Sequence, residues 1–125
     1  EDAKRAIDIG CTGIMVSNHG GRQLDGSRSP FDQLAEICDA VGDKIDVICE
    51  GGIQRGTHVL KALSVGAKAC SGGRLYLYAL AAAGRAGVER ALGNMRTEIE
   101  RDMKLMGVTK LDQLSRDNVR FHHSR

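Results

Sequence analysis

The sequence predicts an α/β fold that forms the last part of a (β/α)8 barrel. Three apolar runs, at 13–16, 45–49 and 67–71, each end in a glycine-rich polar loop that leads into a helical pattern. Strands and helices that alternate at this spacing form parallel sheets with right-handed crossovers. Three strands are too few to close a barrel, and the chain starts within a helical pattern that no strand precedes. We therefore expect residues 1–125 to be one segment of a larger barrel domain.

The bulk composition restricts the class of protein. The 125 residues are enough for one domain with a core, and the net charge of +2 is nearly balanced. Lys and Arg are scattered along the chain, so neither nucleic acid nor an anionic membrane surface is an expected partner. No apolar run has the length of a membrane span, and the first residues do not resemble a signal peptide. We expect a cytoplasmic protein without a membrane segment.

The cysteines and the last histidines do not predict a metal site. Three of the four cysteines lie within apolar or helical patterns, far apart and without a CxxC pair, so all four are expected to be reduced. The terminal His122 and His123 are expected to be a frayed polar end. The four cysteines are Cys11, Cys38, Cys49 and Cys70.

The first half of the chain contains two helical patterns and one strand. Residues 2–9 have helical composition, and Gly10 is placed to end that helix. The apolar run 13–16 is the first buried strand. After a polar loop, Ser29 is a good N-cap and Pro30 suits the first helical position. One face of this second helix is apolar, through Leu34, Ile37, Cys38 and Val41, and Gly42 closes it.

The second half repeats the strand–loop–helix order. The second buried strand is 45–49, and a helix follows at about 55–65 with Gly66 as its cap. The weaker strand 67–71 leads into a long helical region, 76–106, with apolar residues at helical spacing and Arg and Glu outside. The remaining tail has a short apolar patch and is expected to pack on the body.

The loop after the first strand has the residues of a proton-transfer site. It holds His19 and Arg22, bracketed by glycines. A histidine moves protons near neutral pH, and an arginine binds a carboxylate through two parallel hydrogen bonds. The carboxyl ends of parallel strands are where α/β folds place their chemistry. We therefore expect Arg22 to anchor an anionic substrate and His19 to take a proton from it.

The other two loops, 50–56 and 72–74, predict a phosphate site beside the first. Glycines allow backbone N–H groups to approach an anion, and Arg55 and Arg74 add positive charge. The alternative is that these glycines only form turns and the arginines are solvated. In the following helix, His58 is expected to be an ordinary surface residue.

These motifs resemble those of the FMN-dependent 2-hydroxy acid dehydrogenases and oxidases. The resemblance is carried first by Ser17-Asn18-His19-Gly20-Gly21-Arg22-Gln23-Leu24-Asp25 and then by Glu50-Gly51-Gly52-Ile53-Gln54-Arg55-Gly56-Thr57. It continues through Gly73-Arg74 and Leu77-Tyr78-Ala79-Leu80-Ala81 to the tail, and so covers nearly the whole chain. It implies that the chain forms the sixth to eighth strands of a (β/α)8 barrel and the C-terminal helices. It also implies that His19 is the catalytic base and that Arg22 binds the substrate carboxylate.

The resemblance further implies a set of FMN-binding residues. Ser17 matches a serine that contacts the flavin ring, and Glu50 stands where the family usually has Asp. The first phosphate-binding loop is matched by Gly51, Gly52, Ile53, Gln54 and Arg55, and the second by Gly73 and Arg74. Gln54 replaces an arginine that helps to bind the FMN phosphate, so the charge is expected from Arg55 or Arg74.

The implied activity is oxidation of an L-2-hydroxy acid, with lactate as the expected substrate, to the 2-oxo acid with FMN as cofactor. The family's flavin-contacting lysine and the aspartate paired with the catalytic histidine lie on earlier strands, so the segment alone is expected to be inactive. Two alternatives stay open: a phosphate-binding barrel enzyme of another class, and a non-catalytic half-barrel assembly module. Because an open sheet edge pairs readily with other chains, a homo-oligomer is expected.

Overall fold

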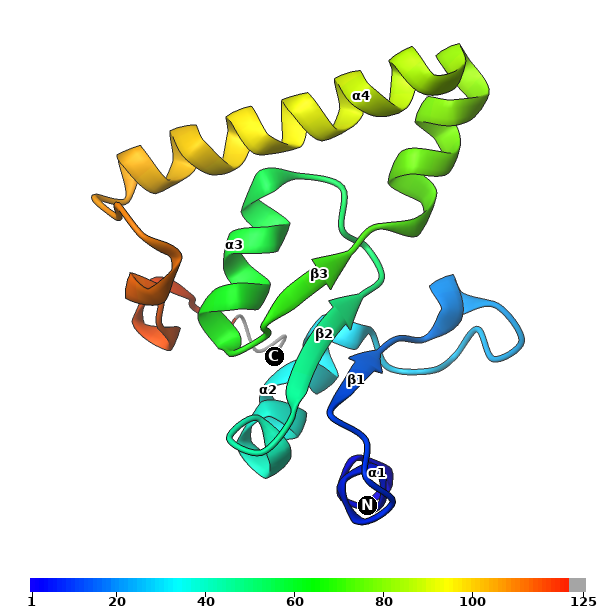
Figure 1. Ribbon diagram of the computed structural model, residues 1–125, viewed down its shortest axis with the longest axis vertical. Coiled ribbons are helices and arrows are strands. Elements are labelled where there is room, and N and C mark those ends of the chain that lie inside the picture. Colours follow the sequence, from blue (N-terminus) through cyan, green and yellow to red (C-terminus); the bar gives the residue numbers. More distant parts are fainter. Residues whose placement is uncertain (122–125) are drawn as a thin grey trace.

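The computed structural model describes residues 1–121, so the expectation for His122 and His123 lies outside the described residues. The helices and strands alternate as predicted (Figure 1). They are α1 (Asp2–Asp8), β1 (Gly13–Val16), α2 (Pro30–Val41), β2 (Asp46–Glu50), α3 (Gly56–Val65), β3 (Ala69–Ser71) and α4 (Gly73–Leu105). No helix in this described part is long and apolar enough to cross a membrane.

The three strands form one parallel sheet in the order β1-β2-β3. Because Val16 pairs with Cys49 in the register, and Cys49 with Cys70, the three polar loops emerge from the same edge of the sheet. Sequential order with parallel pairing is what a segment of a (β/α)8 barrel requires. The α/β class and the parallel sheet are thus confirmed, while the assignment to strands six to eight stays a prediction.

The core lies between one face of the sheet and the helices α2 and α3. Alternate residues of β2 point into it, and Leu34 of α2 has no exposed surface. The opposite face of the sheet carries Met15, which is 53% exposed. The buried core consists of Val16, Leu34, Val41, Ile45, Val47, Cys49, Ala62, Val65 and Ala67.

The helix α2 has the caps that the sequence predicts. The Ser29 hydroxyl accepts a hydrogen bond from the Asp32 N–H at 3.2 Å, Pro30 is the first helical residue and Gly42 is the C-cap. The Ser29 hydroxyl thus satisfies one of the N–H groups that the first turn of a helix leaves without partners. Ser29 and Pro30 also fix the point at which the long loop after β1 ends.

The helix α4 differs from the expectation in two ways. It begins at Gly73, so residues 73–74 are its first turn and not a loop. Its regular geometry is interrupted at Ala83 and Gly84, where Gly84 has φ 56°. Figure 1 shows the consequence: the first part of α4 leads away from β3, and the second part runs back past α3.

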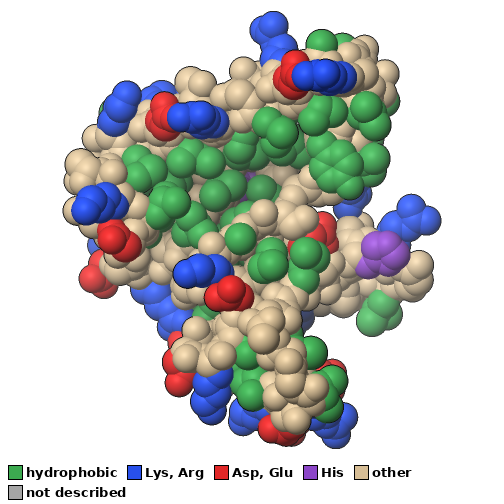
Figure 2. Space-filling view, in the orientation of Figure 1, with side chains coloured by type: hydrophobic (Ala, Val, Ile, Leu, Met, Phe, Trp, Pro, Cys, Tyr) green, Lys and Arg blue, Asp and Glu red, His purple; other side chains and the backbone are tan. Residues whose placement is uncertain are grey.

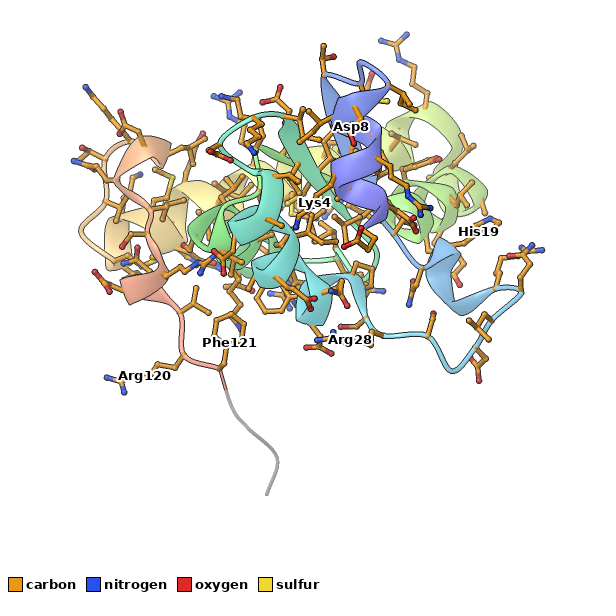
Figure 3. The ribbon with its side chains drawn as sticks, turned by 90° about the horizontal axis from the view of Figure 1, so that it is seen from below. Lys4, Asp8, His19, Arg28, Arg120 and Phe121 are labelled. Carbon is orange, nitrogen blue, oxygen red and sulfur yellow. The ribbon has the colours of Figure 1, made fainter. Side chains whose placement is uncertain are left out.

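The tail packs on the body through Arg116. Its guanidinium donates to both carboxylate oxygens of Asp39, at 2.5 and 3.2 Å, and to the carbonyl of Val65 at 3.2 Å. Phe121 stacks on Phe31 with ring centroids 6.0 Å apart, and Figure 3 shows it at the end of the described chain. The expected packing of the tail is confirmed.

The Arg116 pair predicts a pH dependence of stability. Its hydrogen bond lowers the pKa of Asp39 below the ordinary value. The pair therefore stabilises the fold at neutral pH, and this contribution is lost as the pH falls through the lowered pKa. We expect Arg116→Ala to return the Asp39 pKa to its ordinary range, as measured by NMR titration of the carboxyl carbon. An unchanged pKa would show that the pair does not form in solution.

The cysteines are free. Cys49 is buried, and Cys38 and Cys70 are partly buried. Burial raises the pKa of Cys49 to about 11 and of Cys70 to about 12, and it also raises the pKa of Cys38. Because the thiolate is the reactive form, these thiols are expected to be inert at neutral pH. Cys11 is exposed.

A thiol count tests this arrangement. We expect a disulfide reagent at neutral pH to label Cys11 rapidly and the other three thiols only after denaturant is added. Cys11→Ser is the matched control, because it should abolish the fast phase alone. Fast labelling of two or more thiols in the folded chain would contradict the packing.

Candidate functional site

The first two loops at the carboxyl edge of the sheet and the start of α4 surround a cavity of about 730 Å³. Cavities of this size commonly hold a cofactor or small ligand. Figure 2 shows hydrophobic side chains gathered in the hollow beneath α4. The lining consists of His19, Gly20 and Arg22 from the first loop, Glu50 to Gln54 from the second, Ser71 from β3, and Gly73 to Leu77 from α4. The cavity thus unites most of the residues that the sequence predicts as a site.

The first loop presents His19 in an unusual backbone conformation. His19 has φ 54°, a left-handed value that is uncommon outside glycine and recurs at functional sites. The turn is held by the Asn18 side chain, whose Oδ1 accepts from the Gly20 N–H at 3.1 Å. Figure 3 shows His19 on the loop that projects from the body. The His19 side chain is exposed and able to exchange protons with a ligand in the cavity.

Ser17 connects the first loop to the second. Its hydroxyl donates to the Glu50 carboxylate and accepts from the His19 N–H at 3.0 Å. The carboxylate therefore supports the backbone that carries His19, although the two residues lie on different strand ends. Ser17 itself is not part of the cavity lining, so its predicted contact with a flavin ring stays a prediction.

Arg74 connects the first loop to α4. Its guanidinium donates to the Gly20 carbonyl at 2.7 Å. Gly20 has φ 67°, and a Cβ there would overlap the Arg74 guanidinium. Glycine is therefore required for this close approach. Arg74 lines the cavity together with Arg22, whose guanidinium forms no ion pair within residues 1–121, and the phosphate contact of Arg74 stays a prediction.

The structure places Arg55 away from the cavity. Its guanidinium pairs with Glu98 of α4 at 2.8 Å, and the second Glu98 oxygen accepts from the Gly56 N–H at 2.7 Å. Hydrogen bonding to Arg55, and then to Gly56, lowers the pKa of Glu98. Glu98 thus stabilises the N-terminus of α3 with a negative charge. The phosphate contact predicted for Arg55 stays a prediction.

The N-terminus of α4 borders the cavity, unlike Arg55. Its first residue, Gly73, lines the cavity, and its N-cap, Gly72, provides no side-chain hydrogen bond. The first N–H groups of a helix lack partners within the helix and carry positive charge. Across the cavity, Gly51 and Gly52 have φ 116° and 73°, values that only glycine adopts readily. The glycine loop at Gly51 and Gly52 and the first turn of α4 therefore line the same cavity.

Two residues of this region were missed by sequence reasoning. Glu98 lies 42 residues from Gly56, and no local pattern signals the contact. His58, expected to be an ordinary surface residue, is half-buried and has its Nδ1 2.9 Å from the Gly52 carbonyl oxygen. Its position in the first turn after the glycine loop was the available signal. Within the described part of the chain, no group of three or more His, Cys, Asp and Glu side chains could hold a metal ion.

Similar proteins share both the sequence and the fold. The chain is 48% identical over 122 residues to the L-lactate dehydrogenase (cytochrome) of Saccharomyces cerevisiae, covering 94% of this chain and 21% of that protein. It is 49% identical over 116 residues to an L-lactate dehydrogenase of Caulobacter sp., covering 93% of this chain and 30% of the relative. The chain thus spans about a fifth to a third of the length of these relatives.

Two solved structures superpose closely. The flavin-binding domain of baker's yeast flavocytochrome b2 gives a TM-score of 0.89 at 48% identity, over 93% of this chain and 31% of that one. A soluble mutant of the membrane-associated (S)-mandelate dehydrogenase of Pseudomonas putida gives 0.88 at 40% identity, over 93% and 33%. The family profile described as FMN-dependent dehydrogenase matches residues 1–121. The chain therefore belongs to the FMN-dependent dehydrogenase family.

Proposed function

We propose that the whole protein oxidises an L-2-hydroxy acid to the 2-oxo acid with FMN bound in the cavity. The observation that carries this proposal is the meeting of His19 and Arg22 with the glycine loop and the N-terminus of α4 in one cavity. Family membership supports the cofactor and the reaction class. The names of the yeast and Caulobacter relatives favour L-lactate as the substrate.

The residues present fit FMN. The N–H groups at Gly73 and Arg74, with the glycine loop at Gly51 and Gly52, would hold the phosphate. The apolar wall at Leu75 and Leu77 suits a flat ring, and the Glu50 carboxylate is able to accept hydrogen bonds from the sugar-like chain. FMN would supply the two-electron acceptor for the reaction.

The chain's own residues bind the substrate and move its proton. Arg22 binds the carboxylate of the hydroxy acid through paired hydrogen bonds. Oxidation removes two electrons and two protons from the H–C–OH group, one proton from carbon and one from the hydroxyl, and the carbon–oxygen bond becomes a carbonyl; FMN would supply the acceptor for both electrons and for the proton that His19 does not take. His19 accepts one of these protons on its exposed imidazole. The side chains of Ser17 and Asn18 accept hydrogen bonds from the backbone at and after His19, and these bonds hold the loop in position during this transfer.

A chimera tests the proposal. The matching segment of the Caulobacter L-lactate dehydrogenase is replaced by this chain, and the purified protein is examined by visible absorption. We expect a yellow protein whose flavin absorbance is bleached by L-lactate. A folded chimera that takes up FMN but is not bleached by any 2-hydroxy acid would contradict the proposed activity.

The same chimera separates the alternatives. A folded protein that binds no FMN would favour the non-catalytic assembly module. The homo-oligomer stays a prediction. The cytoplasmic location also stays a prediction, since two Arabidopsis relatives are named peroxisomal (S)-2-hydroxyacid oxidases.

A further inference from the structure

We propose that Glu98 of α4 is a positioning residue for the glycine loop, residues 50–56. Its carboxylate holds the end of this loop, and this contact keeps the loop in the shape that a phosphate group would meet. Glu98 is not among the residues that line the cavity, so it acts through the loop and not by touching a ligand. The inference deepens the proposed function, on which its effect on FMN rests.

Both oxygens of the Glu98 carboxylate bind the junction between the glycine loop and α3. Oε1 accepts from Nε and Nη2 of Arg55, each at 2.8 Å, and Oε2 accepts from the Gly56 N–H at 2.7 Å. Arg55 is the N-cap of α3, and its own side chain makes no capping hydrogen bond. The cap that α3 lacks in its local sequence is therefore supplied by α4, from a side chain 42 residues further along the chain.

Gly56 allows α4 to come this close to the end of the loop. A Cβ at Gly56 would lie 2.6 Å from the Glu98 Cβ and 2.7 Å from the Ile99 nitrogen, distances that real Cβ contacts do not show. The second part of α4 runs back past α3 at this level (Figure 1). The glycine loop therefore ends against the backbone of a long helix, and the Glu98 hydrogen bonds hold it there.

The rest of the glycine loop is held at its start and in its middle. At the start, the Glu50 carboxylate accepts from the Ser17 hydroxyl, and in the middle Ile53 is buried. Between these two points lie Gly51 and Gly52, with φ 116° and 73°. Glycine loses more conformational freedom on ordering than any other residue, so a loop with two glycines needs fixed ends to keep one shape.

Charge and position predict opposite results when the Glu98 carboxylate is removed. Glu98→Ala deletes a negative charge and leaves the Arg55 guanidinium without its partner, so charge alone would raise the affinity of the cavity for an anion. Loss of the loop's shape would lower that affinity, because the ligand would then have to order the loop when it binds. The direction of the change therefore separates the two roles.

NMR on the ¹⁵N-labelled 125-residue chain tests the contact directly. We expect the backbone amides of residues 51–54 to become more mobile in Glu98→Ala, as measured by the heteronuclear NOE, while the amides of β2 stay rigid. Glu100→Ala is the matched control, because Glu100 lies on the same helix and pairs with Arg96 at 2.8 Å. Loop amides that stay rigid in Glu98→Ala would overturn the proposal, as would β2 amides that loosen to the same degree.

FMN binding to the chimera tests the consequence. We expect Glu98→Ala to bind FMN about tenfold more weakly, since ordering the backbone of one residue corresponds to a factor of about that size. Glu100→Ala should leave the dissociation constant unchanged. Glu98→Gln keeps the side-chain length and an oxygen for the Gly56 N–H, so it should recover part of the affinity. An FMN affinity that rises or stays the same in Glu98→Ala would overturn the proposal.

A failure of the proposed function would give a different result. If the chimera without any substitution takes up no FMN, the proposed FMN site is wrong. The role of Glu98 is then decided by the mobility of the loop amides in the 125-residue chain, a measurement that needs no cofactor.

Discussion

Replacement of His19 by Gln is expected to slow flavin reduction by L-lactate by a factor of about 10² to 10⁴ in the chimera, while FMN stays bound. Positioned general bases contribute effects of this size. Glutamine keeps a polar side chain of similar length at the cavity wall but does not accept the proton. Stopped-flow bleaching of the flavin measures the rate, and the yellow colour of the purified variant reports binding.

The control for this experiment separates proton transfer from loop damage. His19 has a left-handed backbone, so most replacements there, including Gln, add some strain to the loop. Asn is tolerated in that conformation, and His19→Asn should therefore lose the same activity with the loop geometry preserved. A normal rate of flavin reduction in either variant would show that His19 is not the base.

Truncation of the core residue Leu34 to Ala is expected to lower the free energy of unfolding by about 2–5 kcal/mol. Leu34 has no exposed surface and lies where α2 meets the sheet, so its removal leaves a cavity that the neighbours fill only in part. Domains of this size have a total stability of about 5–15 kcal/mol. Denaturant unfolding followed by circular dichroism measures the loss.

Leu105 is the matched control for Leu34. It is the last residue of α4 and is 81% exposed, so Leu105→Ala makes the same chemical change without a cavity. We expect its effect to stay within about 0.5 kcal/mol. Equal effects of the two substitutions would mean that the described packing of α2 on the sheet is wrong.

The helices and strands could be predicted from the sequence because the patterns that mark them are local. Ser29 and Pro30 mark the start of α2, and the apolar runs before the glycine loops mark β1 and β2. The start of α4 was placed too late because paired glycines are typical of turns. At Gly73, however, the helix begins directly after β3, without an intervening loop.

The candidate site could be predicted from the sequence only in part. His19, Arg22 and the glycine loops share an edge because parallel strands bring their carboxyl ends together, and the sequence alone predicts this. Contacts between residues far apart in the sequence could not be predicted. The partner of Arg55 lies 43 residues away on α4, and the bond from Arg74 to Gly20 spans 54 residues. Such pairings depend on how α4 packs, which no local pattern specifies.

The Arg55–Glu98 pair also bears on the order in which the chain folds. Glu98 is synthesised long after the glycine loop, and long-range contacts form slowly because they require the closure of a large chain segment. The N-terminus of α3 therefore lacks its anionic partner until α4 has left the ribosome and folded back. Until that closure, the Arg55 guanidinium and the Gly56 N–H, next to the glycine loop, lack the carboxylate that they share in the folded chain.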